Sequence, residues 1–289
     1  MGRRHTQPAM ILPRPVHLAC TAVMVAVAAA PVAFLLLVSV MPDAESVSGR
    51  LWPSRLAVGN YVRLWTTVPM AQGLANSLVV ALGAAVLATL AAVGTAYCLV
   101  RFTFVGRLVL LRSLVGFQAL PGTMLILPLF VVFSSAQAFL GVQLVGSRVG
   151  LVVTYLTFSL PFATWVMVVH LRKIPVALEE AARIDGASRL GALLRVILPL
   201  SVPGMAVATT FCFLNGWNDV VFSSILTQPE TRTAAIELQV FAQSQEGGAL
   251  PLYGQLMAAS VVCAAPVVLL SVIFQRQLVG GLATDGVKG

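Results

Sequence analysis

The chain has 289 residues, of which 58% are hydrophobic and only 10% are charged, and its formal net charge is +8 at pH 7. A soluble domain normally carries about 25% charged residues, so this composition excludes an ordinary soluble fold and indicates a membrane protein. The positive charge does not indicate a nucleic-acid-binding protein, because the basic residues fall where a membrane topology requires them.

Charged residues are absent from six long stretches of the sequence. Each stretch reaches or exceeds the ~20 residues that cross a bilayer as a helix. The stretches are continuously apolar rather than alternating, which favours helices over the strands of a membrane barrel. The predicted fold class is therefore all-α, a polytopic membrane protein with six transmembrane helices. They are expected near residues 18–40, 73–98, 111–133, 149–170, 200–222 and 256–278.

The first predicted element is a basic tail over residues 1–17, followed by the first span. Arg3, Arg4 and Arg14 before an apolar run are also typical of a secretory signal. The hydrophobic part of such a signal usually has about 7–15 residues, whereas Leu18–Pro42 is a run of 25. We therefore expect an uncleaved first span, and a single transmembrane domain over residues 18–289.

Polar residues and prolines interrupt the third and fifth predicted spans. Polar groups at membrane depth are costly and usually face protein or water. These residues therefore predict a solute path, with helix packing and interfacial anchoring by Trp217 as the alternative. The residues predicted for the path are Gln118, Pro121, Asn215, Trp217, Asn218 and Asp219.

The segment Glu179–Pro199, between the fourth and fifth spans, is charged and is expected to be helical. Pro175 suits a first helical position, Gly186 suits the left-handed residue that follows a helix, and Ser188 can cap a second helix. Two short helices joined at a glycine are therefore predicted within residues 172–199. This pair is either an ordinary interfacial loop or a docking site for a soluble partner.

The basic residues predict the orientation of the chain. With a cytoplasmic N-terminus, thirteen of the eighteen lysines and arginines fall in segments on the inner side. Positive charge is retained in the cytoplasm, and six spans return the chain to the side on which it started. Both termini, including the tail 279–289, and the segment 172–199 are therefore expected in the cytoplasm.

Several motifs resemble those of the permeases of binding-protein-dependent ABC importers. Glu180-Ala181-Ala182, three residues, Gly186, nine residues and Val196-Ile197-Leu198-Pro199 resemble the EAA motif of that family, with Val196 replacing the usual isoleucine. The resemblance covers about residues 60–289 and is with the carbohydrate-uptake, MalG-like subfamily. Its other motifs are Asn76-Ser77-Leu78, Ala96-Tyr97, Arg101-Phe102, Leu120-Pro121, Ser159-Leu160-Pro161-Phe162, Gly216-Trp217-Asn218-Asp219 and Val287-Lys288-Gly289.

The resemblance implies a chain that does not hydrolyse ATP. The sequence agrees, because a phosphate-binding loop requires a lysine followed by Ser or Thr, whereas Lys173 and Lys288 are followed by Ile and Gly. No cofactor or metal is expected in this chain, and ATP and Mg²⁺ would be bound by a separate ATPase. In similar permeases the EAA helix docks in a cleft of that ATPase. The residues expected in this contact are Glu179, Glu180, Ala181, Ala182, Asp185 and Gly186.

The implied function is that of a non-catalytic permease subunit of the bacterial inner membrane, forming half of the path for a sugar or sugar-like solute. Its expected partners are a second homologous permease, a dimer of ATPase subunits, an extracellular solute-binding protein or lipoprotein and membrane lipid, but no nucleic acid. By resemblance, the segment between Gln239 and Tyr253 engages the binding protein, and the tail Val287–Gly289 reaches the ATPases.

Two other classes of protein remain as alternatives. An ion-coupled secondary transporter of a small polar solute needs ionisable groups at mid-membrane, and the six charge-free stretches contain no Asp, Glu, Lys or Arg. A membrane enzyme needs a cluster of acids, histidines or metal ligands, which the sequence does not offer. The cysteines, which have neither metal-ligand nor redox spacing, are Cys20, Cys98, Cys212 and Cys263.

Overall fold

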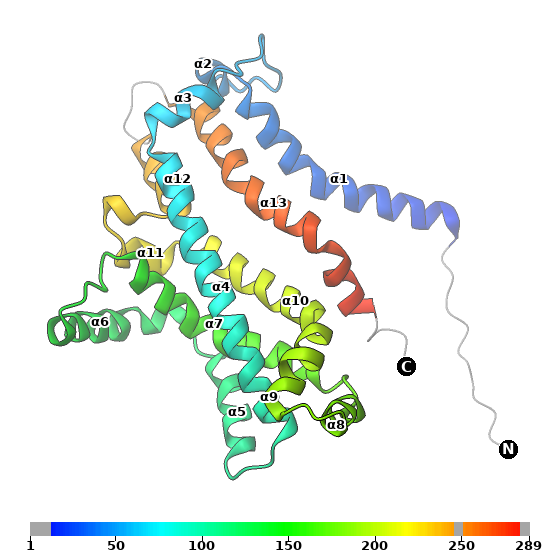
Figure 1. The fold of residues 1–289 in the computed structure, drawn as a ribbon. Coiled ribbons are helices and arrows are strands. Elements are labelled where there is room, and N and C mark those ends of the chain that lie inside the picture. The colour runs from blue at the N-terminus through cyan, green and yellow to red at the C-terminus, as the bar shows by residue number, and fades with distance from the viewer. Residues whose placement is uncertain (1–12, 246–250, 284–289) are drawn as a thin grey trace. The chain divides into compact units, whose positions relative to one another are not determined.

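The computed structural model describes residues 13–245 and 251–283, with side chains as far as residue 275. Within these ranges the regular elements are all helices (Figure 1). The chain divides into two compact units, one made of residues 1–64 and 245–261 and the other of residues 65–244 and 262–289.

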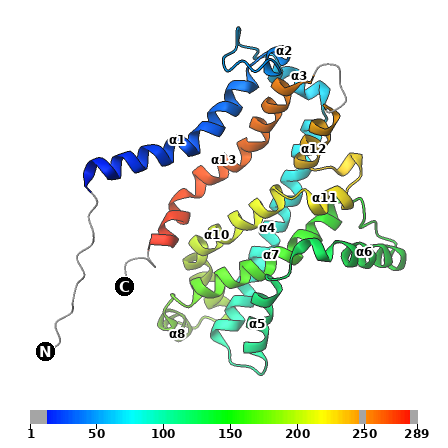
Figure 2. The same ribbon diagram turned by 180° about the vertical axis from the view of Figure 1, so that it is seen from behind.

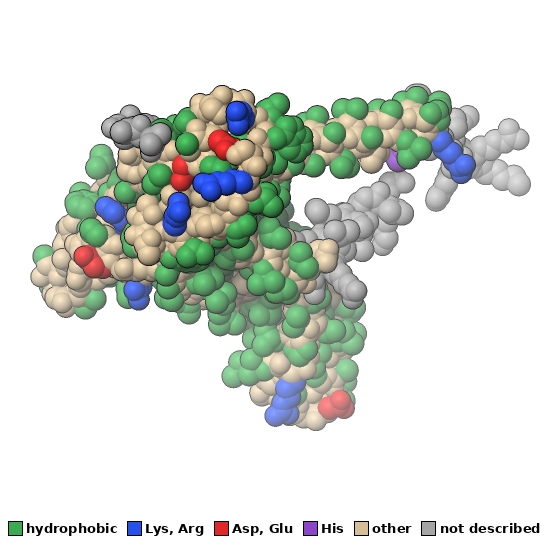
Figure 3. All heavy atoms as spheres, turned by 90° about the horizontal axis from the view of Figure 1, so that it is seen from above, with side chains coloured by type: hydrophobic (Ala, Val, Ile, Leu, Met, Phe, Trp, Pro, Cys, Tyr) green, Lys and Arg blue, Asp and Glu red, His purple; other side chains and the backbone are tan. Residues whose placement is uncertain are grey.

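In the described part of the chain, six helical segments are long and apolar enough to cross a membrane, which confirms the predicted fold class. Hydrophobic side chains cover much of the surface seen in Figure 3, where charged side chains are few. The helices that form these segments are α1 (Arg14–Ser39), α4 (Met70–Arg101), α6 (Ile126–Leu140), α7 (Arg148–Leu171), α10 (Leu198–Trp217) and α13 (Tyr253–Ala283).

The third span differs from the prediction of one helix over residues 111–133. The structure has α5 (Arg107–Phe117), a break, and a 3₁₀ turn η1 (Gly122–Leu125) that leads into α6, and the candidate span runs from Gly122 to Leu140. Pro121 accounts for the break, because proline has no N–H to donate to the preceding turn. Its ring also drives the residue before it away from the helical conformation.

At the other five predicted spans, the bounds of α1, α4, α7, α10 and α13 lie within five residues of the expected ones. The fifth span was expected over 200–222, but α10 ends five residues earlier, at Trp217. A separate helix, α11 (Val221–Leu226), follows. The turn between the two helices contains the polar residues Asn218 and Asp219, which the predicted span ran through.

The first unit contains α1, α2 (Asp43–Ser46), the start of α3 (Asn60–Thr67) and the first part of α13. Its polar contacts hold the segment that follows α1. The buried Asn60 side chain donates to the carbonyl oxygens of Ser39 and Met41 at 3.0 and 2.9 Å. Asp43 accepts hydrogen bonds from the backbone N and side-chain Nε2 of Gln255. The Asn60 contacts fasten the end of α1 and the residues after it to α3, and the Asp43 contacts fasten α2 to the beginning of α13.

The core of the second unit is the packing of α4 against α7 and α10, which lie side by side in Figures 1 and 2. Thr209 of α10 donates to Thr89 of α4 at 2.9 Å between their Oγ1 atoms. Two rows of α4 side chains, each at four-residue spacing, are buried here and are mostly small, which lets helix backbones approach closely. The rows are Val80, Ala84, Ala88, Ala92 and Ala96, and Ala81, Ala85, Thr89, Val93 and Tyr97.

The first turns of α4 hold the segment that follows α11, made of η3 (Pro229–Thr231) and α12 (Ala234–Ser244). Asn76 donates to the carbonyl oxygens of Glu230 and Arg232 at 3.1 and 2.8 Å. Ser77 accepts from the backbone N of Ala234 at 2.8 Å. On α12, burial raises the pKa of the Glu237 carboxyl. Side chains near the N-terminus of α4 therefore fix the path of this segment.

Replacing Ala88 with leucine is expected to destabilise the protein, because Ala88 is 0% exposed and overpacking a close-packed site costs about 1–3 kcal/mol. The midpoint of thermal unfolding of the detergent-purified protein measures the change. Ala91→Leu is the matched control, since Ala91 is exposed on the same helix. Equal losses in both variants would contradict the packing described for α4.

Candidate functional site

The segment between α7 and α10 folds, as predicted, into two short helices, α8 (Val176–Ile184) and α9 (Arg189–Ala192). Gly186 has a φ of +90°, the left-handed conformation that glycine adopts after a helix. The Ser188 hydroxyl accepts a hydrogen bond from the backbone N of Gly191 at 3.1 Å and caps α9. A π-helical turn, η2 (Leu193–Ile197), then leads into α10.

One side of α8 and the turn after it form an exposed surface of low relief, which we call the EAA surface. Glu180, Ala181, Asp185 and Gly186 are exposed, and Ala182 is half-buried. Two alanines and a glycine leave room for another backbone to approach, and the two carboxylates offer negative charge. This surface therefore offers small side chains and negative charge side by side.

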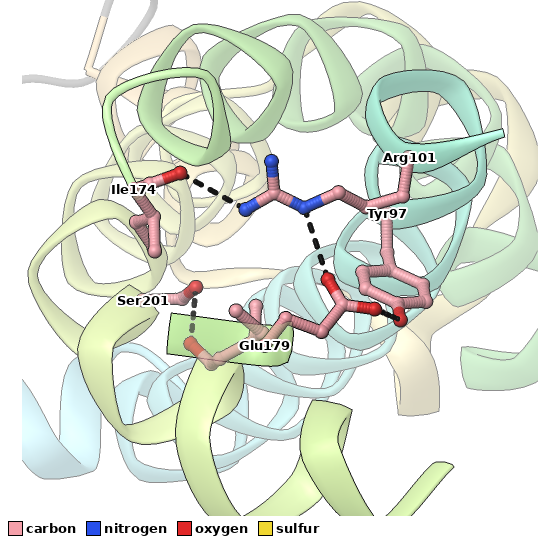
Figure 4. Close-up of polar contacts among 6 residues, drawn as sticks. Tyr97, Arg101, Ile174, Glu179 and Ser201 are labelled. Atoms are coloured by element: carbon pink, nitrogen blue, oxygen red, sulfur yellow. Dashed lines mark hydrogen bonds and ion pairs between the residues drawn. The ribbon is translucent and has the colours of Figure 1, made fainter. Parts of the chain in front are cut away.

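Glu179 is placed differently from the other five residues predicted for the same contact. It is only 8% exposed, and it points towards the end of α4 (Figure 4). The Tyr97 hydroxyl donates to Glu179 Oε1 at 2.5 Å, and Arg101 Nε lies 3.2 Å from Glu179 Oε2. The second contact is an ion pair rather than an aligned hydrogen bond. Glu179 therefore faces the protein interior and lies outside the EAA surface.

The same end of α4 also holds the turn before α8 and the start of α9. Arg101 Nη2 donates to the Ile174 carbonyl oxygen at 3.0 Å. The guanidinium carbon of Arg189 lies 5.3 Å from the centre of the Phe102 ring, within cation–π range. Phe102 in turn packs edge-to-face on Tyr97, with 5.8 Å between ring centres. None of these α4 residues was predicted from the sequence to hold the helix pair.

A cavity of about 340 Å³ lies beside α5, α7 and α10. Small-molecule sites in proteins usually measure about 300–1,000 Å³. Ser159 Oγ is buried and has no hydrogen-bond partner among the described residues. None of the side chains that line the cavity is charged, and four are aromatic. They are Phe117, Gln118, Leu120, Phe158, Ser159, Phe162, Phe211, Cys212 and Asn215.

The structure brings Gln118 and Asn215 together at this cavity, but not the other four residues predicted for a solute path. Pro121 forms the break before η1, and Asn218 is exposed beyond the end of α10. Trp217 is buried, with its Nε1 donating to the Cys263 carbonyl oxygen of α13 at 3.2 Å. This contact is the helix packing that the sequence analysis kept as the alternative for Trp217.

Asp219 is engaged in fixing the turn between α10 and α11. Its carboxylate accepts hydrogen bonds from the Tyr155 hydroxyl at 2.8 Å and from the backbone N of Ser223 at 2.9 Å. A longer bond of 3.3 Å comes from the backbone N of Phe222. The two backbone contacts cap the first turn of α11, and the bond from Tyr155 ties that turn to α7. These contacts occupy both oxygens of the carboxylate.

No three His, Cys, Asp or Glu side chains gather into a metal-binding group in the residues that the structure describes. The four cysteines form no disulfide. The side chains at the EAA surface offer negative charge, and those at the cavity offer hydrogen-bonding groups and aromatic rings.

A helical membrane protein with an exposed charged helix pair between its fourth and fifth spans, and a cavity among its spans, has the features of a membrane transport subunit. The family model described as "Binding-protein-dependent transport system inner membrane component" matches residues 84–283. The chain belongs to this family. It is thus a non-catalytic permease subunit of an ABC importer and an inner-membrane protein, which confirms the predicted family and sets aside the ion-coupled alternative.

Individual relatives agree with this membership. The chain is 33% identical over 262 residues to the sulfoquinovosyl glycerol transport system permease protein SmoH of Agrobacterium fabrum, covering 90% of this chain and 88% of SmoH. It is 30% identical to the trehalose transport system permease protein SugB of Mycobacterium tuberculosis, covering 90% and 92%. The fold is similar to a crystal structure of a bacterial ABC transporter involved in alginate import, with a TM-score of 0.76, 21% identity and coverage of 93% and 99%.

Replacing Asp219 with alanine is expected to lower stability, because loss of a helix cap costs about 0.5–2 kcal/mol and the Tyr155 hydroxyl also loses its partner. Asp219→Asn keeps a capping oxygen and is expected to lose less. Thermal unfolding of both purified variants, with Asn218→Ala as the exposed neighbouring control, measures the difference. An Asp219→Ala variant as stable as wild type would show that the turn does not depend on this carboxylate.

Proposed function

We propose that this chain forms half of the membrane path of a sugar importer and that a separate ATPase drives it through the EAA surface. The observation that carries the proposal is the exposure of Glu180, Ala181, Asp185 and Gly186 on a helix pair that is otherwise anchored to the membrane helices. Relatives of the same family are permease subunits, and their names specify transport systems.

The proposed assembly contains a second homologous permease, two ATPase subunits that bind ATP and Mg²⁺, and an extracellular solute-binding protein. The distribution of the basic residues supports a cytoplasmic position for the helix pair and both termini, where an ATPase has access to ATP. A similar structure is that of an alginate ABC transporter in complex with a periplasmic protein, which supports a binding-protein contact. The segment expected to make this contact, 239–253, is partly outside the described residues, and the tail Val287–Gly289 lies wholly outside them.

In the proposed contact, Glu180 pairs with a basic residue of the ATPase while Ala181 and Ala182 allow close approach. A charge that becomes partly buried at an interface depends on its partner, because an uncompensated buried charge is costly. Asp185 adds a second carboxylate at the end of the same helix. Charge reversal at Glu180 therefore replaces attraction by repulsion at the centre of the surface.

The solute proposed for the cavity is a sugar without formal charge. The names of similar permeases include trehalose, diacetylchitobiose and maltose. The aromatic rings that line the cavity offer stacking faces, and Gln118, Ser159 and Asn215 offer hydrogen-bonding groups. No lining side chain supplies a counter-charge for an ionic solute.

The Glu180→Arg variant is expected to insert normally but to lose most of the co-purifying ATPase, because a repelling charge at a docking surface costs on the order of several kcal/mol. The ratio of ATPase to permease after affinity purification measures this. Glu230→Arg makes the same change at an exposed glutamate of η3 and is the matched control. Wild-type recovery of the ATPase with Glu180→Arg would contradict the proposed docking surface.

Replacing Asn215 or Gln118 with alanine is expected to reduce uptake about tenfold or more while the complex still assembles, since each buried ligand hydrogen bond contributes roughly 1–3 kcal/mol. Uptake of radiolabelled trehalose, maltose and diacetylchitobiose into cells that express the complete transporter measures the effect on whichever sugar the wild type carries. Asn218→Ala is the control outside the cavity. Equal uptake in the Asn215 and Asn218 variants would count against a solute site in this subunit.

A further inference from the structure

We infer that the side chains of Tyr97, Arg101 and Glu179 form a clamp that transmits movement of α8 to α4. These residues therefore set how efficiently ATP hydrolysis in the partner moves the membrane helices, rather than how tightly the ATPase binds. The inference rests on the proposed function and deepens it, because it divides the carboxylates of α8 into two roles. Glu180 recognises the partner chain, and Glu179 connects that contact to the membrane helices (Figure 4).

The clamp is built from buried groups. The side chains of Arg101 and Glu179 are only 9% and 11% exposed, and the Tyr97 hydroxyl lies 2.5 Å from the carboxylate. In such surroundings the attraction between the two charges is screened weakly by water and salt. Removing one partner leaves the other charge buried and uncompensated. Movement of α8 therefore cannot easily break this contact.

The end of α4, where the clamp lies, contacts three other segments of the chain. Arg101 donates to the Ile174 carbonyl oxygen in the turn before α8, while the same side chain pairs with Glu179 in the first turn of α8. Arg189 at the start of α9 lies over Phe102, the residue directly after α4. Both halves of the helix pair are thus attached to one end of α4, on either side of the Gly186 bend.

The backbone of α8 by itself does not provide this connection. Its most extensive backbone contacts are with α9 and η2, the elements that follow it in the chain. The link to α4 is carried by the side chains of Tyr97, Arg101 and Glu179. Since α4 packs along α7 and α10, and both of these helices contribute residues to the cavity, movement of α4 reaches the solute site.

The test measures ATP-dependent access to the cavity in the whole transporter and needs no knowledge of its solute. The four natural cysteines are replaced by alanine, and Leu120, which lines the cavity, is replaced by cysteine. The complex of permeases and ATPases is reconstituted in vesicles. The rate of N-ethylmaleimide labelling at position 120 is then compared without nucleotide and after trapping with Mg²⁺–ATP and vanadate. ATP hydrolysis and ATPase recovery are measured in the same preparations.

Glu179→Gln and Arg101→Ala are expected to retain the ATPase and to hydrolyse ATP, but to lose the nucleotide-dependent change in labelling by on the order of tenfold, the usual size of coupling between sites. Tyr97→Phe removes only the hydroxyl and is expected to have a smaller effect in the same direction. The exchanged pair Arg101→Glu with Glu179→Arg is expected to recover part of the labelling change that each single reversal loses. Arg172→Ala, in the exposed turn before α8, is the matched arginine control.

Three results would overturn the inference. The first is a full labelling response in the Glu179→Gln and Arg101→Ala variants. The second is loss of ATPase binding in folded clamp variants, which would make the clamp a support for the docking surface. If the charge variants fail to insert, a wild-type response in Tyr97→Phe is the third. Failure of the proposed function is distinguishable, because the Glu180→Arg variant would then retain both the ATPase and the labelling response.

Discussion

The second unit of this protein depends on the close approach of α4 to its neighbours, which small side chains permit. In lipid there is no hydrophobic drive between helices, so association depends on the fit of their surfaces and on the hydrogen bonds that cross them. Two buried rows, mainly of alanine, give α4 the shape for this fit against α7 and α10. The polar residues of α4 are thereby free to act at its ends, where they hold other segments.

The charged residues likewise lie outside the spans or at their ends. Six stretches without Asp, Glu, Lys or Arg account for the spans, and the buried pair of Arg101 and Glu179 lies at the point where α4 ends. There the Tyr97 hydroxyl donates a hydrogen bond to Glu179, and Arg101 donates one to the Ile174 carbonyl oxygen. These hydrogen bonds offset the cost of removing the two charges from water. The carboxylate of Glu180, one residue further on, is exposed, so it stays hydrated and is available to a partner.

Much of this arrangement follows from local sequence signals, and the remainder depends on contacts between distant residues. Hydropathy is enough for five of the six spans but not for the third, where the helix breaks before Pro121. Gly186 and Ser188 are enough for the bend between α8 and α9. Tyr97 and Arg101 are four residues apart and so share a helix face, a signal that was present in the sequence. Their partner Glu179 could not be chosen over Glu180 from sequence alone, because 82 residues separate it from Tyr97 and only the fold decides which carboxylate turns inward.

One helix therefore carries Asn76 near its first turn and Arg101 at its last. With 32 residues and a rise of 1.5 Å for each, α4 spans about 48 Å. A rigid rod held at both extremities links events there thermodynamically: whatever shifts it at one extremity alters the energy of the contacts at the other. Linkage of this kind is reciprocal. If a protein docked on the η3–α12 segment favours one position of the rod, nucleotide-driven selection of that same position must strengthen the docking by an equal factor.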